Sequence, residues 1–311
     1  MLHGWIILDK PLGLGSTSAV SAVKRALREA GEPKTKVGHG GTLDPLASGV
    51  LPIALGEATK LAGHMLDATK AYEFTIAFGT QTDTLDLEGK IIATSDARPT
   101  LAEVEAILPR FTGPIEQVPP IYSAIKIGGK AAYARARAGE TLEMETRQVA
   151  IHSLCVSAAP REQNDFAQRR GGAEVLSSVT LSATVSKGTY IRSLARDIAL
   201  ALNTVGHVTM LRRTKAGPFT LESAISLDKL ADAAKARALT RMVLPLSAGL
   251  DDIPALPVTP DQARLLRQGQ MLFGIPATPG LHLAIEAETP VALVEISEGG
   301  SKVVRGFNLN E

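Results

Sequence analysis

The stretch GHGGTLDPLASGVLP, residues 38–52, constrains this chain more than any other part of its sequence. Three glycines in its first four positions allow the backbone to approach a ligand closely, because they carry no Cβ. Pro45 holds Asp44 out of the helical region, in an extended or turn conformation. The apolar run from Val50 to Leu55 is typical of a buried strand. An isolated Leu-Asp-Pro more often caps a turn, but here we expect Asp44 on a loop anchored by a core strand, as binding and catalytic groups commonly are.

Length and composition restrict the class of protein. The 311 residues suffice for one large domain and a small one, and 45% hydrophobic with 21% charged residues is typical of a globular chain. There is no apolar run of membrane-spanning length, and the first residues lack the pattern of a signal peptide. The single Cys155 excludes an intramolecular disulfide and agrees with a reducing compartment. We expect a cytoplasmic protein.

Charge is distributed unevenly along the chain, although the net charge is only +1. Residues 10–36 contain six basic and two acidic residues, and residues 187–215 contain six basic and one acidic residue. Residues 249–311 contain four basic and eight acidic residues. Two basic segments are a pattern that favours nucleic-acid binding, whereas an ordinary solvated helix face is the alternative for the first of them.

The order of predicted elements indicates an α+β fold with a mixed, mainly antiparallel sheet, because strands and helices do not alternate regularly. Strands are predicted at residues 4–8, 71–78, 122–127, 150–156, 175–185 and 206–213, with 150–156 paired to 175–185. Helices are predicted at residues 16–30, 57–68, 100–108 and 189–202. Ser16 or Thr17 should cap the first helix, and Thr100 with Glu103 forms a capping-box pattern. Residues 158–173, polar and rich in arginine, read as a mobile loop insertion whose role stays open.

The pattern of predicted elements changes near residue 250. Residues 251–257 are a plausible linker into a small β-rich tail, in which 291–296 and 302–309 are predicted to form a hairpin. We therefore expect two domains, residues 1–250 and residues 251–311.

Five blocks of this chain together resemble the TruB-type tRNA pseudouridine synthases. They are ILDKPLG (7–13), the 38–52 stretch, KAY (70–72) followed by 79–89, PIYSAIK (120–126) and SKGTYIR (186–192). The blocks are collinear with the family's and extend over residues 3 to about 230. The resemblance implies the pseudouridine synthase fold, a small PUA-like barrel at the C-terminus, and formation of pseudouridine in the T loop of tRNA at the position conventionally numbered fifty-five.

The resemblance implies a role for three catalytic residues. Asp44 is the essential carboxylate; whether it attacks the sugar, attacks the uracil ring or removes a proton stays open. Arg192 should pair with Asp44 and keep it ionised, the alternative being a phosphate-binding or surface arginine. Tyr72 should stack on the target uracil and assist the proton transfer at C5.

Four further residues should bind the substrate. Tyr190 and Leu211 should line the uracil pocket. His39 should fill the place that the flipped base vacates, the alternative being a backbone hydrogen bond. Lys10 is expected either to contact phosphate or to help hold the pocket, with a surface lysine as the alternative. Gly15, where the family more often has threonine or serine, is a departure from its pattern.

Isomerisation of uridine involves no redox change, and the chain has no dinucleotide fingerprint, phosphate-binding loop or metal-ligand spacing. We expect no cofactor and no metal. The expected partner is the T stem-loop of tRNA, without a membrane or an obligate protein partner, and we expect a monomer. Two alternatives remain: a catalytically silent tRNA-binding or tRNA-folding protein, and a related pseudouridine synthase that acts on another RNA.

Overall fold

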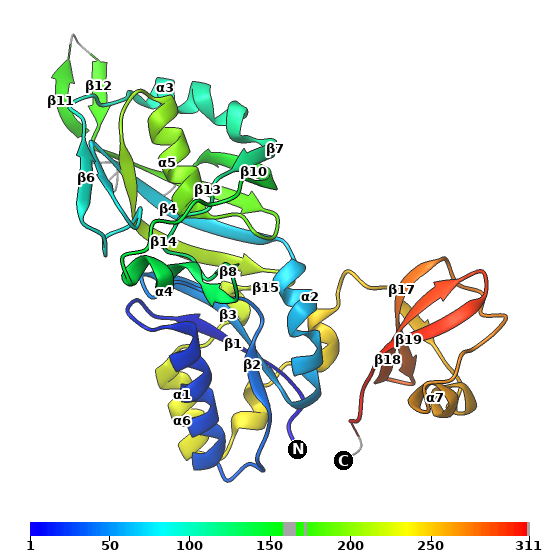
Figure 1. The fold of residues 1–311 in the computed structure, drawn as a ribbon. Helices are drawn as coiled ribbons and strands as arrows, with labels where there is room; N and C mark the ends of the chain where they lie inside the picture. The colour runs from blue at the N-terminus through cyan, green and yellow to red at the C-terminus, as the bar shows by residue number, and fades with distance from the viewer. Residues whose placement is uncertain (158–165, 171–172, 310–311) are drawn as a thin grey trace. The chain divides into compact units, whose positions relative to one another are not determined.

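The computed structural model describes residues 1–157, 166–170 and 173–309 (Figure 1). The chain divides into two compact units. The first consists of Met1–Pro45, Gly49–Leu66 and Ala216–Glu311, and the second of Leu46–Ser48 and Asp67–Lys215. Each unit combines helices with mainly antiparallel strands, so the predicted α+β class is confirmed.

The first unit is built on strands β1 (Gly4–Lys10), β2 (Val37–His39) and β3 (Ala47–Leu55). Both β1 and β2 pair with β3 in antiparallel register. Seven consecutive residues at the end of β3 are buried, which confirms the predicted core strand. Helices α1 (Ser16–Glu29) and α6 (Leu227–Lys235) lie side by side (Figure 1), and their apolar faces share one hydrophobic core with β1 and β3.

Short elements complete this core. The predicted helix at 57–68 is a 3-10 turn, η1 (Gly56–Leu61), followed by α2 (Ala62–Asp67). The others are β15 (Phe219–Thr220), η4 (Leu221–Ser223), η5 (Leu239–Met242) and η6 (Leu246–Gly249). Trp5 is fully buried, and its indole N–H donates a hydrogen bond of 3.1 Å to the Leu246 carbonyl. This bond holds the η6 segment against β1.

The end of the chain forms a separate four-stranded sheet with its own apolar core. Its elements are β16 (Ala255–Pro257), α7 (Pro260–Arg267), β17 (Gly280–Glu286), β18 (Thr289–Ser297) and β19 (Gly300–Gly306). Strand β16 is parallel to β17, whereas β18 pairs with both neighbours in antiparallel register. The predicted β-rich tail and its hairpin are confirmed. The expected boundary at residue 250 and the PUA-like character of the tail stay predictions.

The second unit contains the strand order β14-β4-β13-β10-β7. The strands are β14 (Gly206–Ala216), β4 (Lys70–Phe78), β13 (Ser178–Val185), β10 (Arg147–Val156) and β7 (Gly113–Gln117). The β4–β13, β13–β10 and β10–β7 pairs are antiparallel, which confirms the predicted pairing of 150–156 with 175–185. Helices α3 (Leu101–Ile107) and α5 (Ile191–Ala201) pack on this sheet around a second apolar core.

Smaller elements of this unit differ from the predictions in two places. They are β5 (Thr80–Thr82), β6 (Ile91–Thr94), η2 (Leu108–Phe111), β8 (Lys126–Ile127), β9 (Lys130–Ala131), α4 (Ala132–Arg137), β11 (Phe166–Arg170) and β12 (Ala173–Leu176). The predicted strand at 122–127 is wrong except for its last two residues, which pair with β9. The predicted insertion at 158–173 contains strand β11, paired with β12, and its residues 158–165 and 171–172 lie outside the described residues.

Candidate active site

Asp44 lies on the loop that connects β2 to β3, as the sequence predicts. The two strands are paired, with His39 opposite Ile53, so both ends of the loop are fixed. The backbone N–H of Gly40 donates to the Pro52 carbonyl at 2.8 Å, and Gly13 N–H donates to the Pro45 carbonyl at 2.8 Å. The loop is thus held by main-chain hydrogen bonds on each side of the carboxylate.

Ser16 holds the residue that precedes Asp44. Its hydroxyl donates to the Leu43 carbonyl and accepts from the Leu43 N–H, each at 2.8 Å. Both Ser16 and Leu43 are buried. The predicted cap of α1 by Ser16 or Thr17 is wrong: the N-cap is Gly15, without a side-chain hydrogen bond. The Ser16 hydroxyl binds the Asp44 loop instead of the helix end.

Gly40 is required by close packing. A Cβ at this position would lie 2.8 Å from the Cβ of Met65 and 3.5 Å from the Trp5 ring. Since real Cβ atoms do not approach other carbons that closely, a larger residue would displace the loop from the core. This contact explains one glycine of the glycine-rich pattern in residues 38–41.

Lys10 is fully buried at the end of β1, so the alternative of a surface lysine is wrong. Its ammonium donates to the carbonyls of Leu14 at 2.7 Å, Pro11 at 3.0 Å and Pro45 at 3.4 Å. A phosphate contact requires an accessible ammonium, so burial contradicts that form of the predicted substrate binding. The geometry agrees with the other form, in which Lys10 helps to hold the pocket by joining the 11–14 turn to the Asp44 loop.

Tyr72 and Leu211 belong to the second unit and pack at the edge of the same apolar core. Tyr72 lies on β4 opposite Ala183 of β13, and Leu211 lies on β14, the neighbour of β4 on its other side. Both side chains are partly buried, so each keeps some accessible surface. An aromatic ring and an aliphatic side chain on adjacent strands suit the flat, apolar faces of a base.

Lys70 was not singled out by the sequence as a site residue. It lies two positions before Tyr72 on β4, and therefore on the same face of the strand. Burial, together with the nearby charge of Arg213, lowers the pKa of Lys70 to about 8. The sequence offered one signal for this residue, because lysine is depleted within strands and the block KAY begins a predicted strand.

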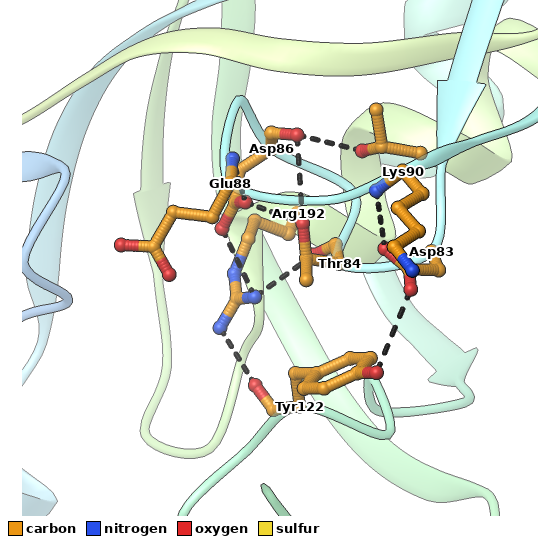
Figure 2. A network of polar contacts seen from close by, with 8 residues as sticks. Asp83, Thr84, Asp86, Glu88, Lys90, Tyr122 and Arg192 are labelled. Atoms are coloured by element: carbon orange, nitrogen blue, oxygen red, sulfur yellow. Dashed lines mark hydrogen bonds and ion pairs between the residues drawn. The ribbon is translucent and has the colours of Figure 1, made fainter. Parts of the chain in front are cut away.

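Arg192 is the centre of a polar network shown in Figure 2. The side chain is buried, with Nη1 3.2 Å from Asp86 Oδ2 and 2.9 Å from the Thr84 carbonyl. Nη2 donates to the Tyr122 carbonyl at 3.0 Å. Asp86 is held in turn by the Thr84 hydroxyl at 2.5 Å and the Glu88 N–H at 3.0 Å. The plane of the guanidinium is therefore fixed by groups from two loops.

The sequence did not identify Asp86 as the partner of Arg192. Asp86 lies within the 79–89 block, which contains several other polar residues that could equally have been chosen as the partner. Nothing in linear spacing connects it to a helix more than one hundred positions away. The predicted pairing of Arg192 with Asp44 stays a prediction.

Segment 117–122 is fastened to the start of α5, where Tyr190 is the N-cap residue. The Tyr190 N–H donates to Gln117 Oε1 at 2.8 Å. The Ser193 hydroxyl and Arg196 Nη2 both donate to the Val118 carbonyl, at 2.8 and 3.1 Å. These bonds fix the backbone that carries Tyr190.

The two basic segments differ in exposure. In residues 187–215, Arg192 and Arg213 are buried, so part of the positive charge points into the protein. In residues 10–36 only Lys10 is buried among the basic residues, and the others are exposed. Both segments therefore present positive charge to solvent, the first through five exposed side chains and the second through Lys187 and Lys215.

The predicted site residues are divided between the units. Lys10, His39 and Asp44 belong to the first, and Tyr72, Tyr190, Arg192 and Leu211 belong to the second. Within the described ranges, no group of three His, Cys, Asp or Glu residues is arranged to hold a metal ion. No helix in the described part of the chain is long and apolar enough to cross a membrane.

Curated relatives are similar to this chain over nearly its whole length. One from Novosphingobium aromaticivorans, named tRNA pseudouridine synthase B, is 60% identical over 311 residues, covering 100% of this chain and 99% of its own. One of the same name from Zymomonas mobilis is 61% identical over 307 residues, covering 99% and 96%.

Solved structures share the fold. The "Structure of H/ACA RNP bound to a substrate RNA containing 2'-deoxyuridine" superposes with a TM-score of 0.71 at 23% identity, covering 99% of this chain and 86% of that one. The "Crystal Structure of a Cbf5-Nop10-Gar1 Complex" gives a TM-score of 0.70 at 25% identity, with coverage of 98% and 84%.

Two family models match consecutive parts of the sequence. Residues 24–191 match the N-terminal domain of the TruB family pseudouridylate synthases, and residues 192–251 match the tRNA pseudouridylate synthase B C-terminal domain. With these matches and the full-length relatives, the resemblance first seen in five short blocks is confirmed. This chain belongs to the TruB family of pseudouridylate synthases.

Proposed function

We propose that this chain isomerises uridine to pseudouridine in tRNA, at the T-loop position conventionally numbered fifty-five. Its 60% and 61% identity to two relatives named tRNA pseudouridine synthase B, over almost their full lengths, carries the proposal. The residues that the family motifs assign to catalysis are all present in this sequence.

The reaction breaks the bond from uracil N1 to the sugar C1′, turns the base and joins C5 to C1′. The proton on C5 leaves and N1 gains one, so atoms and electrons balance without an oxidant or reductant. The protein must supply one group that acts as nucleophile or base, and a pocket that retains the detached base. Carboxylates perform the first role at sugars. Asp44 fits it because its two neighbours are held by buried side chains: Leu43 by the Ser16 hydroxyl and the Pro45 carbonyl by the Lys10 ammonium.

Arg192 is proposed to pair with the Asp44 carboxylate. Because Asp86, Thr84 and Tyr122 fix the guanidinium, its orientation is set before any substrate binds. A guanidinium of fixed orientation favours the ionised carboxylate and sets its direction. The network therefore supports a role in positioning Asp44, beyond simple charge.

The target base must leave the RNA stack, which costs a few kcal/mol. Tyr72 is proposed to stack on the flipped uracil and to assist the proton transfer at C5, with Tyr190 and Leu211 lining the pocket. His39 is proposed to occupy the vacated place in the RNA. Since all of these residues come from one chain, we propose an active monomer, working in the cytoplasm where tRNA is matured.

The test is to incubate the purified protein with unmodified tRNA and to map pseudouridine at nucleotide resolution. Modification confined to the T loop supports the proposal. Binding of tRNA without any modification favours a silent tRNA-folding protein, and modification only of another RNA favours a related synthase. A monomer is checked by light scattering with and without tRNA.

A further inference from the structure

A basic groove lies on the first unit between α1 and the segment that follows it. Its volume is about 840 Å³. It is lined by Ser21, Lys24, Leu27, Arg28, Glu32, Pro33, Lys34, Thr35, Lys36 and Val37. Four of these residues are cationic and one is anionic. None of them has a role in the proposed chemistry.

The groove is formed by the way in which α1 ends. The Gly31 N–H donates to the Arg28 carbonyl and the Glu32 N–H to the Leu27 carbonyl, which is a Schellman motif with Gly31 in the left-handed region at φ +78°. This turn sends the chain back along the helix into β2. Lys24 and Arg28, one helical turn apart, therefore share a wall, and the 33–37 segment forms the opposite one.

The cationic side chains of the groove form no salt bridges within the described part of the chain. Lys24, Arg28, Lys34 and Lys36 are all exposed, and none has a carboxylate within salt-bridge distance in the part of the chain that the structure describes. Leu27 and Val37, both buried, form an apolar floor. Cations gathered over low-dielectric walls repel one another and focus a positive potential. This arrangement favours an anionic ligand and costs stability without one.

We propose that this groove binds the phosphate backbone of the tRNA substrate. The inference rests on the proposed function. It assigns to the groove a contribution to tRNA affinity and no part in the isomerisation reaction. A site with exposed cations on two walls suits a continuous polyanion better than a compact metabolite. Lysine and arginine contacts of this kind carry no base specificity.

The position of the groove along the chain supports this assignment. Val37 lines the groove and is the first residue of β2, whose last residue is His39. Two residues along a strand span about 7 Å. RNA that places a base at His39 therefore has phosphates of the same or a neighbouring strand within reach of the groove.

The experiment compares two double variants of the full chain. Lys24→Gln/Lys34→Gln removes two cations from the groove. Lys229→Gln/Lys235→Gln removes two exposed lysines from α6 in the same unit and serves as the matched control. All four side chains are at the surface, and thermal unfolding verifies that both variants fold. Binding to unmodified tRNA is measured across a salt series, and pseudouridine formation in a single turnover at saturating enzyme.

The groove variant should lose affinity on the order of ten-fold at 0.1 M salt, and its plot of log affinity against log salt should be shallower by about one to two. Its saturating single-turnover rate should stay within about two-fold of wild type, and the control should bind as wild type does. Equal affinity and slope for the groove variant and wild type would overturn the inference. If wild type binds tRNA through the groove but forms no pseudouridine, the proposed function is wrong and the assignment of the groove to tRNA binding is retained. If wild type forms pseudouridine and the groove variant binds tRNA as wild type does, only the assignment of the groove to tRNA binding is wrong.

Discussion

Replacing Ser16 by alanine should loosen the loop that carries Asp44 without touching any group that contacts RNA. The Ser16 hydroxyl satisfies both main-chain groups of Leu43, at 2.8 Å each, in a buried environment. Ser16→Ala removes one donor and one acceptor at once. The N–H and the carbonyl of Leu43 are then left without their partner.

The magnitude follows from the cost of buried polar groups without partners, about 1–3 kcal/mol each. Two such groups give an expected loss of about 2–6 kcal/mol in the free energy of unfolding, and the loss lies at the lower end of this range if water enters to satisfy them. Since domains are stable by about 5–15 kcal/mol, the variant should still fold. A displacement of Asp44 by about 1 Å is enough to slow the reaction by about a hundred-fold. We expect a rate ten- to a hundred-fold below wild type.

Chemical denaturation measures the stability, and single-turnover pseudouridine formation at saturating enzyme measures the rate. Ser18→Ala is the matched control, because Ser18 lies on the same helix but is exposed. The tRNA affinity of Ser16→Ala should equal that of wild type. If Ser16→Ala matches Ser18→Ala in both stability and rate, the loop does not depend on this serine and the reasoning is refuted.

Three further changes test other parts of the site. Asp86→Asn removes the charge that holds Arg192 and should lower the free energy of unfolding by about 3 kcal/mol and the single-turnover rate; an unchanged rate would mean that the network is only structural. Arg192→Lys should impair single-turnover chemistry more than tRNA affinity, because lysine cannot form a planar bidentate pair; the opposite result would identify a phosphate contact. Lys70 has a lowered pKa of about 8 in the fold against 10.5 when unfolded, so the unfolded chain binds more protons between these values. Wild type should therefore gain stability relative to Lys70→Met as pH rises from about 8 to 10, measured as the difference in Tm, and a constant difference would contradict the burial of a charged amine.

Elements set by local interactions could be predicted from the sequence. The capping box of Thr100 and Glu103 is present at the start of α3, with both reciprocal hydrogen bonds. The apolar run from Val50 to Leu55 is a buried strand, because its side chains have few alternatives to the core. The collinear blocks placed Asp44 on its loop.

Features that depend on tertiary contacts could not be predicted. Tyr122 and Ile125 favour a strand, but the Tyr122 carbonyl accepts a hydrogen bond from Arg192, and the Ser123 N–H donates to the Ile121 carbonyl within a tight turn. Ser16 resembles a helix cap, yet the backbone of Leu43 competes for its hydroxyl. Lys10 resembles a strand-end surface lysine, and only the fold shows that three carbonyls surround its ammonium. In each case the partner is remote in sequence or carries no side-chain signal.

The most direct test of the whole account is pseudouridine formation by Asp44→Asn. The substitution keeps the volume of the side chain and removes the charge that the reaction needs. We predict wild-type stability within about 1 kcal/mol, since surface-accessible changes are usually small, unchanged tRNA affinity, and no pseudouridine in the T loop after prolonged single-turnover incubation. Formation of pseudouridine by Asp44→Asn at the rate of wild type would contradict the assignment of Asp44 as the catalytic residue.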